Sequence, residues 1–521
     1  MATVKLGSNA TVAKIFDATP QVVQRCLQLL SYKVDGMGSG WSGRSSFFEV
    51  TNCTFPAGFA WLIQAELTKD GHTVLWTKKP VAEPLGPYDP IVDEFGNDNP
   101  DYDFQIKALR QVEKHGAGII RVATGGGKSK IAKLIMSRFR RMTLFLTTRG
   151  ILLYQMDDQL KEIGLNTGQI GDGELRLVRG VNLGMVQTLV QSLEEPDLGA
   201  EVRAVIKSMN LKADKLPTDA KKQILELAET KFKAKVAKRE QTIKILEMIE
   251  VVIGEEAHEA GGNSYYQILK HCKNATVRVA LTATPFMRDS AEDNMRLMAA
   301  FGPVLIDVSE ELLINRGILA KPYFQYKDIL PPKRLHRTSP YERATTLGYV
   351  ENENMHEELV NDAKRAAALG LPVLCLILRV KHGEGLLERY QAAGLRTEFL
   401  KGENKQKERK AQLERLRKGE LDVLIGTTIL DVGVDCPAIG LAQLAGGGKA
   451  EVALRQRIGR VLRKKKKGPN VAFVIDYSCN HATVLRDHAR QRQNIVQSTP
   501  GFVEGIVEEL PWNLFEEALA A

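Results

Sequence analysis

The chain has 521 residues, of which 44 % are hydrophobic and 26 % are charged, and its formal net charge is +9 at pH 7. This composition is typical of a globular protein, and the length predicts about three domains of ~150 residues each. No apolar run approaches the ~20 residues of a membrane-spanning helix, so we expect no membrane span, and the positive charge favours a polyanionic partner.

The cysteines are scattered along the chain, without the C-x-x-C spacing of a metal site. We therefore expect reduced thiols and a cytoplasmic location, and the N-terminal residues lack the apolar core of a secretory signal. The six residues are Cys26, Cys53, Cys272, Cys375, Cys436 and Cys479.

Residues 1–79 have the pattern of a small α/β domain. The expected elements are a helix over residues 11–32 with a break at Pro20, a strand over 46–53, a helix over 59–69 and a strand over 72–77. The glycine-rich loop of residues 36–44 carries Trp41 and Arg44. Such a loop either stacks on a nucleic-acid base and follows the backbone, or it is a hairpin loop whose tryptophan enters the core.

Residues 80–103 form the expected linker to the next domain. They hold five prolines and seven acidic residues but no Lys or Arg. Proline blocks regular structure and like charges repel, so we expect a domain boundary there.

Residues 104–315 alternate apolar strands with amphipathic helices, which predicts a parallel sheet covered by helices. A similar block follows at 316–480, so we expect two lobes, and residues 481–521 are expected to form a packed C-terminal helix and a tail. The expected strands are 118–122, 143–146, 183–186, 251–253 and 277–281 in the first lobe, and 373–378, 396–400, 423–426, 440–444 and 471–475 in the second.

A basic segment interrupts the first block at residues 197–248. Residues 201–244 carry twelve Lys and Arg against six Asp and Glu, with helical spacing. We expect an inserted helical hairpin that turns near Pro217. The pattern leaves open whether this hairpin contacts nucleic acid or is a solvated helix pair.

The chain is organised around residues 119–129, where an apolar run ends in a glycine-rich turn before an amphipathic helix. Glycines let backbone N–H groups approach a polyphosphate, and the positive end of the helix dipole favours an anion. Lys128 has the reach for the β- and γ-phosphates, and the Ser129 hydroxyl suits Mg²⁺. Val122 replaces the first glycine of G-x-x-x-x-G-K-[ST], and a flexible turn beside a surface lysine is the alternative.

Two carboxylates follow the fourth expected strand of the first lobe. Hydrolysis of a triphosphate needs one carboxylate to hold Mg²⁺ and another to orient the attacking water, and Glu255 and Glu256 suit these roles. His258, Thr282 and Thr284 are candidates for coupling this site to the rest of the lobe. An acidic turn and a capped turn are the alternatives for these motifs in isolation.

Arg460 and Arg463 lie three residues apart, which places them on one face of a helix. Guanidinium groups suit bidentate contacts with phosphate. As arginine fingers from the second lobe, they would stabilise the charge of the transferring γ-phosphate, an effect worth about 10³–10⁵ in rate.

In this order the motifs resemble those of superfamily 2 helicases. They read A-T-G-G-G-K-S, T-T-R, Q-T-L, E-E-A-H, T-A-T-P, G-T-T-I-L-D-V-G-V-D and Q-R-I-G-R-V-L-R within residues 104–480. Residues 147–158 and the small N-terminal domain are most similar to the UvsW-type branch-migration DNA helicases of phages. The resemblance implies an α/β fold with two tandem RecA-like parallel-sheet lobes and a small N-terminal α/β accessory domain that binds DNA.

The resemblance also implies roles for single residues. Gln105 corresponds to the glutamine that reads adenine, Ser129 and Glu255 to the Mg²⁺ ligands, and Glu256 to the residue that activates water. The phosphate loop comprises Thr124, Gly125, Gly126, Gly127, Lys128 and Ser129, and the second lobe contributes Gly433, Asp435, Arg460 and Arg463 to the nucleotide. The nucleic-acid backbone would be held by Thr148, Arg149, Gln187, Thr188, Gly402, Thr427 and Thr428.

Two positions depart from the family pattern. Glu255 replaces the usual aspartate, and its extra methylene moves the carboxylate outward, but the charge is kept, so we expect ATP hydrolysis. Residues 101–104 replace the usual Leu-Arg-Pro-Tyr ahead of Gln105, which weakens the expectation of adenine selectivity.

These features predict an ATP- and Mg²⁺-dependent DNA helicase or translocase that unwinds or branch-migrates branched DNA in replication, recombination or repair. We expect a monomer or weak oligomer in the cytoplasm, that of the host if a phage encodes the chain. The alternatives are an RNA helicase, a DNA translocase that does not separate strands, and a non-hydrolysing, ATP-clamped nucleic-acid-binding protein.

Overall fold

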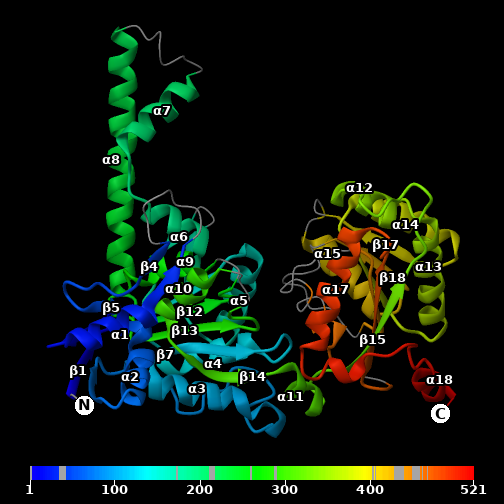
Figure 1. Ribbon diagram of the computed structural model, residues 1–521, viewed down its shortest axis with the longest axis horizontal. Coiled ribbons are helices and arrows are strands. Elements are labelled where there is room, and N and C mark those ends of the chain that lie inside the picture. The colour runs from blue at the N-terminus through cyan, green and yellow to red at the C-terminus, as the bar shows by residue number, and fades with distance from the viewer. Residues whose placement is uncertain are drawn as a thin grey trace. The chain divides into compact units, whose positions relative to one another are not determined.

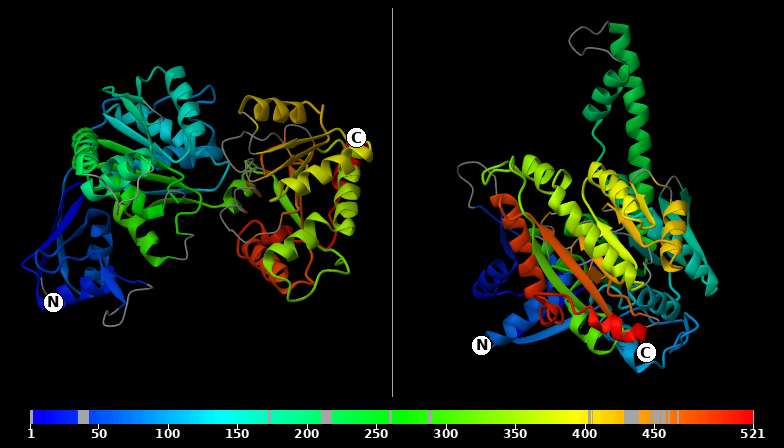
Figure 2. Two further views of the ribbon diagram at one scale, coloured as in Figure 1. Left: turned by 90° about the horizontal axis from the view of Figure 1, so that it is seen from above. Right: turned by 90° about the vertical axis from the view of Figure 1, so that its right-hand side faces the viewer.

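The computed structural model describes residues 3–34, 43–171, 174–209, 218–258, 261–286, 290–401, 404, 406–427, 439–446, 448, 454, 458–459, 461–465 and 468–520. The chain forms two compact units (Figures 1 and 2). The first comprises Met1–Arg121 and Lys128–Asp307, and the second comprises Val122–Gly127 and Val308–Ala521. Among the described residues, no helix is both long and apolar enough to cross a membrane.

The first unit is built on an eight-stranded sheet in the order β10-β9-β11-β8-β12-β13-β7-β14. Its central strands pair in parallel, with Ile253 of β12 opposite Phe145 of β8 and Val279 of β13. The strands are β7 (Ala117–Val122), β8 (Thr143–Thr147), β9 (Thr167–Gly171), β10 (Glu174–Arg176), β11 (Val181–Met185), β12 (Val251–Glu255), β13 (Val277–Thr282) and β14 (Val304–Val308).

The five strands expected in the first lobe are present, and their continuous apolar runs are buried, as helices on both faces of a parallel sheet require. Strands β9, β10 and β14 were not predicted, because β9 contains two glycines, β10 is fully exposed and the pattern of β14 is mixed. The helices of this block are α3 (Asp103–His115), α4 (Lys128–Phe139), α5 (Gly150–Glu162), α6 (Val186–Leu193), α9 (Gly261–Leu269) and α10 (Ala291–Phe301).

The N-terminal region has a second, four-stranded sheet in the order β5-β2-β1-β6, with two helices. Its elements are β1 (Thr3–Ser8), β2 (Val12–Phe16), α1 (Pro20–Leu30), β5 (Thr54–Pro56), α2 (Ala60–Lys69) and β6 (Thr73–Lys78), and a short hairpin pairs β3 (Ser31–Lys33) with β4 (Arg44–Ser46). The helix over 59–69 and the strand over 72–77 are therefore confirmed.

Two predictions for this region are wrong. Residues 12–16 form a strand rather than the start of a helix, because their burial alternates with a period of two, and α1 begins only at Pro20, where the Thr19 hydroxyl caps Val22 N–H. The strand predicted over 46–53 is interrupted by a turn in which Cys53 has a φ of 52°. The loop that carries Trp41 lies outside the described residues.

The N-terminal region packs on the larger sheet's helices. Ala299 of α10 belongs to its hydrophobic core, and a Cβ on Gly58 would lie 2.5 Å from the carbonyl oxygen of Ala299. The expected linker has no helix or strand over residues 79–99, yet it follows the first unit closely: Gly86 N–H donates to Arg138 O at 2.8 Å, and Lys130 pairs with Asp93 at 2.9 Å. The segment rich in proline and acidic residues is therefore irregular, as predicted, but it packs against the first unit.

The predicted helical hairpin is confirmed. It consists of α7 (Leu198–Ser208) and the long α8 (Thr218–Met248), which extends away from the sheet (Figure 1). Val205, Ile224 and Ala228 form a small core of its own near the tip, whereas Leu246 at the base of α8 belongs to the core of the sheet. The predicted turn at Pro217 lies outside the described residues.

The second unit has a six-stranded parallel sheet in the order β15-β20-β19-β16-β18-β17. All five expected strands are present, and β15 was not predicted because its polar residues hide the apolar pattern. The strands are β15 (Lys321–Asp328), β16 (Val373–Leu376), β17 (Thr397–Leu400), β18 (Val423–Gly426), β19 (Leu441–Leu444) and β20 (Val471–Ser478), and the helices include α11 (Glu310–Asn315), α13 (Glu353–Ala368), α14 (Val380–Ala392), α15 (Gln406–Arg417), α17 (Thr483–Gln497) and α18 (Asn513–Ala520).

The C-terminal segment is part of the second unit's core rather than a tail. The rings of Trp512 and Phe515 pack edge-on against Phe473 of β20, with centroids 5.0 and 5.2 Å away. The expectation of a helix after residue 480 is met by α17, whereas the expectation of a tail missed these two aromatic anchors.

Candidate nucleotide and nucleic-acid site

The loop between β7 and α4 has the backbone geometry of an anion cradle. Gly125 and Gly127 adopt φ values of 91° and 83°, in the left-handed region that glycine tolerates. A Cβ on Gly126 would lie 2.4 Å from Val122 Cγ1, so this position also requires glycine. The helix that follows has no acidic residue in its first turn, which leaves its positive dipole end for an anion.

Lys128 opens α4 and is 8 % exposed. Its Nζ lies 3.3 Å from Oε1 of Glu256, the residue that follows β12. A buried ammonium group needs an anionic partner, and in this structure the carboxylate supplies it. A triphosphate would compete with Glu256 for the same cation.

Glu256 has a φ of 44°, one of four positive values at described non-glycine residues. A side chain in this region costs of order 1–3 kcal/mol, and such strain is concentrated at functional sites. The conformation turns the chain sharply at the carboxyl end of β12. The strain therefore coincides with the carboxylate that the sequence assigned to water activation.

A series of polar contacts continues from Glu256 to the neighbouring strand β13. His258 Nδ1 lies 3.4 Å from Glu256 Oε2 and 2.7 Å from Thr282 Oγ1, and Thr284 N–H donates to Thr282 Oγ1 at 3.1 Å. His258, Thr282 and Thr284 are all buried. The motifs E-E-A-H and T-A-T-P are thus in direct contact, as their proposed coupling requires.

Glu255 is the last residue of β12 and is 7 % exposed. Its backbone is paired with Leu281 of β13, and the Tyr265 hydroxyl donates to its carbonyl oxygen at 2.9 Å. Tyr265 was not predicted as a site residue, because a tyrosine within a helix of mixed composition has no recognisable motif.

Four predicted nucleic-acid contacts are brought together by strand order. Thr148 and Arg149 follow β8, and Gln187 and Thr188 open α6 after β11. These two strands are parallel neighbours with Thr147 opposite Met185, so the two pairs emerge at the same sheet edge. Glu255 and Thr282 end β12 and β13 at that edge too, because all four strands run in the same direction.

Gln105 is buried in the first turn of α3, which packs against α4. Its predicted contact with adenine stays a prediction. The helix that carries it nevertheless neighbours the helix that Lys128 opens, so its position is compatible with a nucleotide on the phosphate loop.

Beyond the glycine-rich loop, two further residues of the predicted site lie in the described part of the second unit. Thr427 follows β18 and is 8 % exposed, and Arg463 forms a β-bridge with Leu319. The roles of these residues stay predictions. Gly402, Thr428, Gly433, Asp435 and Arg460 lie outside the described residues.

The donor set suits Mg²⁺ bound together with a nucleotide. Glu255 offers a carboxylate and Ser129 a hydroxyl, and Mg²⁺ in such sites takes one or two protein oxygens with phosphate oxygens and water. Within the described ranges, no three His, Cys, Asp or Glu side chains gather as a metal cage. The oxygen donors and the cradle geometry of the loop therefore fit the nucleotide-bound ion rather than a protein-only metal centre.

Two protein-family profiles match the chain. Residues 100–287 match the family described as type III restriction enzyme, res subunit, and residues 368–465 match the helicase conserved C-terminal domain. The first match contains the phosphate loop and the carboxylate pair, and the second contains Thr427 and both arginines of the finger motif.

Among curated relatives, a protein of Sulfolobus islandicus filamentous virus named as a candidate helicase is 25 % identical over 285 residues, which cover 51 % of this chain. The chain spans only 49 % of that relative's length. The DNA 3'-5' translocase XPB2 of Sulfurisphaera tokodaii is 24 % identical over 404 residues, covering 70 % of this chain and 79 % of its own.

Two solved structures align with this chain. The helicase MrfA bound to DNA aligns with a TM-score of 0.51 and 14 % identity, over 80 % of this chain and 53 % of that chain. The T4 UvsW structure aligns over 97 % of this chain and 98 % of its own, with 15 % identity and a TM-score of 0.43.

Proposed function

We propose that this chain, which belongs to superfamily 2 of the helicases, is an ATP-driven DNA translocase that remodels branched DNA. The observation that carries the proposal is the shared carboxyl edge of the eight-stranded sheet. Residues suited to a nucleotide follow β12 and β13, and residues suited to a nucleic-acid backbone follow β8 and β11.

The hydrolytic step uses the pair formed by Lys128 and Glu256. When the γ-phosphate draws the Lys128 ammonium group to itself, the Glu256 carboxylate loses the partner that lies 3.3 Å away. It is then available to accept a proton from the attacking water. Glu255 and Ser129 would hold Mg²⁺, and the ion would supply positive charge to stabilise the phosphates during hydrolysis.

Coupling to the nucleic acid follows from the contact between motifs. A change at Glu256 reaches Thr282 through His258, whose Nδ1 lies within 3.4 Å of both side chains. Because β12 also pairs with β8, displacement at this edge is transmitted to Thr148 and Arg149. Contacts to a backbone carry no base information, so sequence preference is expected to be weak.

The direct test is ATP hydrolysis with and without DNA. We expect stimulation by DNA, and we expect Lys128→Ala to abolish turnover while the fold is retained, because the cation that holds the phosphates is removed. Lys133→Ala, on the same helix, is the matched control and should keep turnover. If no DNA stimulates ATP hydrolysis by this chain, it is not a DNA translocase.

Further arms separate the related activities. Stimulation by RNA but not by DNA would identify an RNA helicase, and tight ATP binding with no phosphate release would identify a nucleotide clamp. Displacement of a triplex-forming strand without unwinding of a forked duplex would identify translocation alone. Branch migration of a four-way junction, compared with unwinding of forks of each tail direction, tests the preference for branched DNA.

A further inference from the structure

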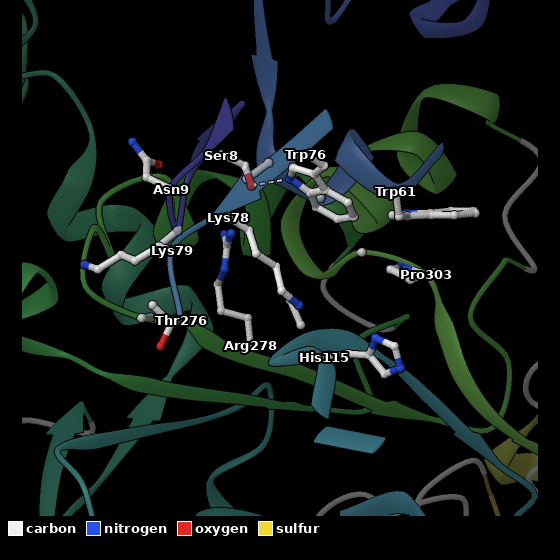
Figure 3. A pocket seen from close by; sticks show the side chains of 16 residues that line it. Ser8, Asn9, Trp61, Trp76, Lys78, Lys79, His115, Thr276, Arg278 and Pro303 are labelled. Atoms are coloured by element: carbon white, nitrogen blue, oxygen red, sulfur yellow. Dashed lines mark hydrogen bonds between the residues drawn. The ribbon is translucent and has the colours of Figure 1, made fainter. Parts of the chain in front are cut away.

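A pocket lies between the N-terminal sheet and the larger sheet of the first unit (Figure 3). It has a volume of about 140 Å³. Ala117, which begins β7, and Arg278, near the start of β13, contribute to its wall. The candidate nucleotide site follows the opposite ends of the same two strands, so the pocket is a separate place in the fold.

Arg278 is the most unusual group in this pocket. It is only 4 % exposed, and its buried Nε has no hydrogen-bond partner among the described residues. Burial lowers the pKa of its guanidinium group to about 10. A buried cation without a partner is costly, and an anion that enters the pocket would remove that cost.

The other charged groups in the wall are also basic. Lys78, Lys79 and His115 line the pocket, and no Asp or Glu does. In Figure 3 the side chains of Lys78 and Arg278 extend into the region between Trp76 and His115. Burial, Lys114 and Lys78 lower the pKa of His115, which is consistent with a positive potential there.

Two tryptophans complete the wall. Trp61 Nε1 is buried without a hydrogen-bond partner among the described residues, whereas Trp76 Nε1 donates to Ser8 Oγ at 2.9 Å. Lys78 Nζ lies 5.9 Å from the centre of the Trp76 ring. Aromatic faces beside cations are the combination that binds a base together with its phosphate.

We propose that this pocket is a second phosphate-binding site, which takes the phosphate ester of a nucleotide or of a nucleic-acid strand. Arg278 and Lys78 bind the phosphate oxygens, and Trp61 or Trp76 contacts the attached base. The basic side chains of the wall and the guanidinium group of Arg278 indicate that the ligand carries a phosphate. The two tryptophan rings favour a nucleotide over inorganic phosphate. The site is independent of ATP hydrolysis at Lys128.

The experiment follows the imidazole NMR signal of His115 in the full-length chain, assigned with His115→Gln. Inorganic phosphate, pyrophosphate, a nucleoside monophosphate and a single-stranded oligonucleotide are titrated separately at constant ionic strength. An anion in the pocket raises the pKa of His115, so the signal should shift towards that of the protonated ring. If the His115 signal responds to the small phosphates, the pocket binds a free phosphate or nucleotide. If it responds to the oligonucleotide alone, the pocket binds a nucleic-acid strand.

Arg278→Leu should weaken the response about 10- to 100-fold, because a charge-assisted hydrogen bond is removed. The thermal midpoint of the Arg278→Leu variant should stay or rise, since an unpaired buried charge is replaced by an apolar group of similar size. If Arg278 had a purely structural role, its replacement would lower the midpoint. Lys78→Gln, at the exposed side of the pocket, should weaken the response several-fold and keeps the test open if Arg278→Leu fails to fold. Lys14→Gln, an exposed lysine of the same sheet outside the pocket, is the matched control.

A wild-type chain whose His115 signal responds to none of the four ligands overturns the proposal, as does a response that both Arg278→Leu and Lys78→Gln leave unchanged. Neither result bears on ATP hydrolysis, which is measured separately without DNA. A chain that binds phosphate here yet lacks DNA-stimulated turnover would refute the proposed function and keep this site.

Discussion

Glu256, the residue that follows β12, combines three properties. Its backbone is strained at a φ of 44°, its carboxylate lies 3.3 Å from a buried lysine, and it is in reach of His258. A residue with a merely structural role would be expected to relax into a favourable conformation. The strain is instead maintained by contacts on both sides, which holds the carboxylate in position before a substrate arrives.

Glu256→Gln tests this assignment. We expect turnover to fall by about 10²–10⁴, because the amide cannot accept a proton, whereas ATP affinity should stay or rise as Lys128 is released for the phosphates. Phosphate release and nucleotide binding are measured on the same preparation. Glu250→Gln, directly before β12, is the control, and turnover within a few-fold of the wild type in Glu256→Gln would contradict the role.

His382 of α14 makes the second unit sensitive to acid. It is 2 % exposed, its ring centre lies 5.4 Å from that of the buried His356, and burial followed by the charge of His356 lowers its pKa to about 3. The unfolded chain takes up a proton near pH 6.5, but the folded chain does not. Stability that is present above pH 6.5 is therefore lost as the pH falls towards 3.

From these pKa values, the loss attributable to His382 at pH 5 is about 2 kcal/mol. Urea denaturation of the second unit between pH 7 and pH 5 measures it, and His382→Leu should flatten the dependence. If the wild type and His382→Leu lose stability in parallel, His382 is not the titrating group.

At the scale of elements, the α7–α8 hairpin is separable from the sheet that carries it. The Val205–Ile224–Ala228 core lies near the tip, and Arg239 Nε donates to Leu193 O at 3.1 Å at the base. Exposed lysines, rather than apolar residues, cover much of α8 between these points. The arrangement suits a lever or clamp for a polyanion, and a solvated helix pair is the alternative.

Removal of residues 199–238, with a short Gly-Ser connection, should leave the fold and the DNA-independent ATPase unchanged. DNA affinity and the stimulation of turnover should fall, because the exposed cations go with the hairpin. Substitution of Lys221, Lys222, Lys231, Lys233 and Lys238 by Gln keeps the hairpin and should reproduce the loss. Unchanged DNA affinity in both variants would show that the hairpin is only solvated.

For the whole molecule, the net charge of +9 and the polar contacts at the sheet edge predict binding dominated by phosphates. Affinity for a DNA duplex should fall at least about tenfold between roughly 50 and 200 mM salt, measured by fluorescence anisotropy. Arg149→Gln should reduce the slope of log affinity against log salt by about 1, whereas Arg140→Gln, an exposed arginine on the same unit, should not. A salt-independent affinity would rule out backbone recognition.

Local chemistry was readable from the sequence. Long apolar runs predicted the five central strands of the first sheet and five of the second, because a strand covered on both faces must be apolar throughout. The glycine-rich turn after β7 was readable from the sequence since its backbone requires glycine, and the carboxylate pair was readable since it follows a buried apolar run. Strands β9, β10, β14 and β15 were not predicted, because half-exposed or glycine-containing segments have too weak a hydrophobic pattern.

What only the tertiary structure decided depends on groups far apart in the chain. Strand order brings the ends of β8 and β11, which precede Thr148 and Gln187, side by side and His258 beside Thr282. Packing alone places Tyr265 on Glu255 and Trp512 on Phe473. That Arg278 Nε is buried without a hydrogen-bond partner among the described residues also depends on its surroundings, because the sequence of a strand does not show which groups face an arginine. The sequence by itself determined which chemical groups are available, because each motif is a short local stretch of the chain. The tertiary structure decided which of these groups meet, because the contacts join residues that are far apart in the sequence.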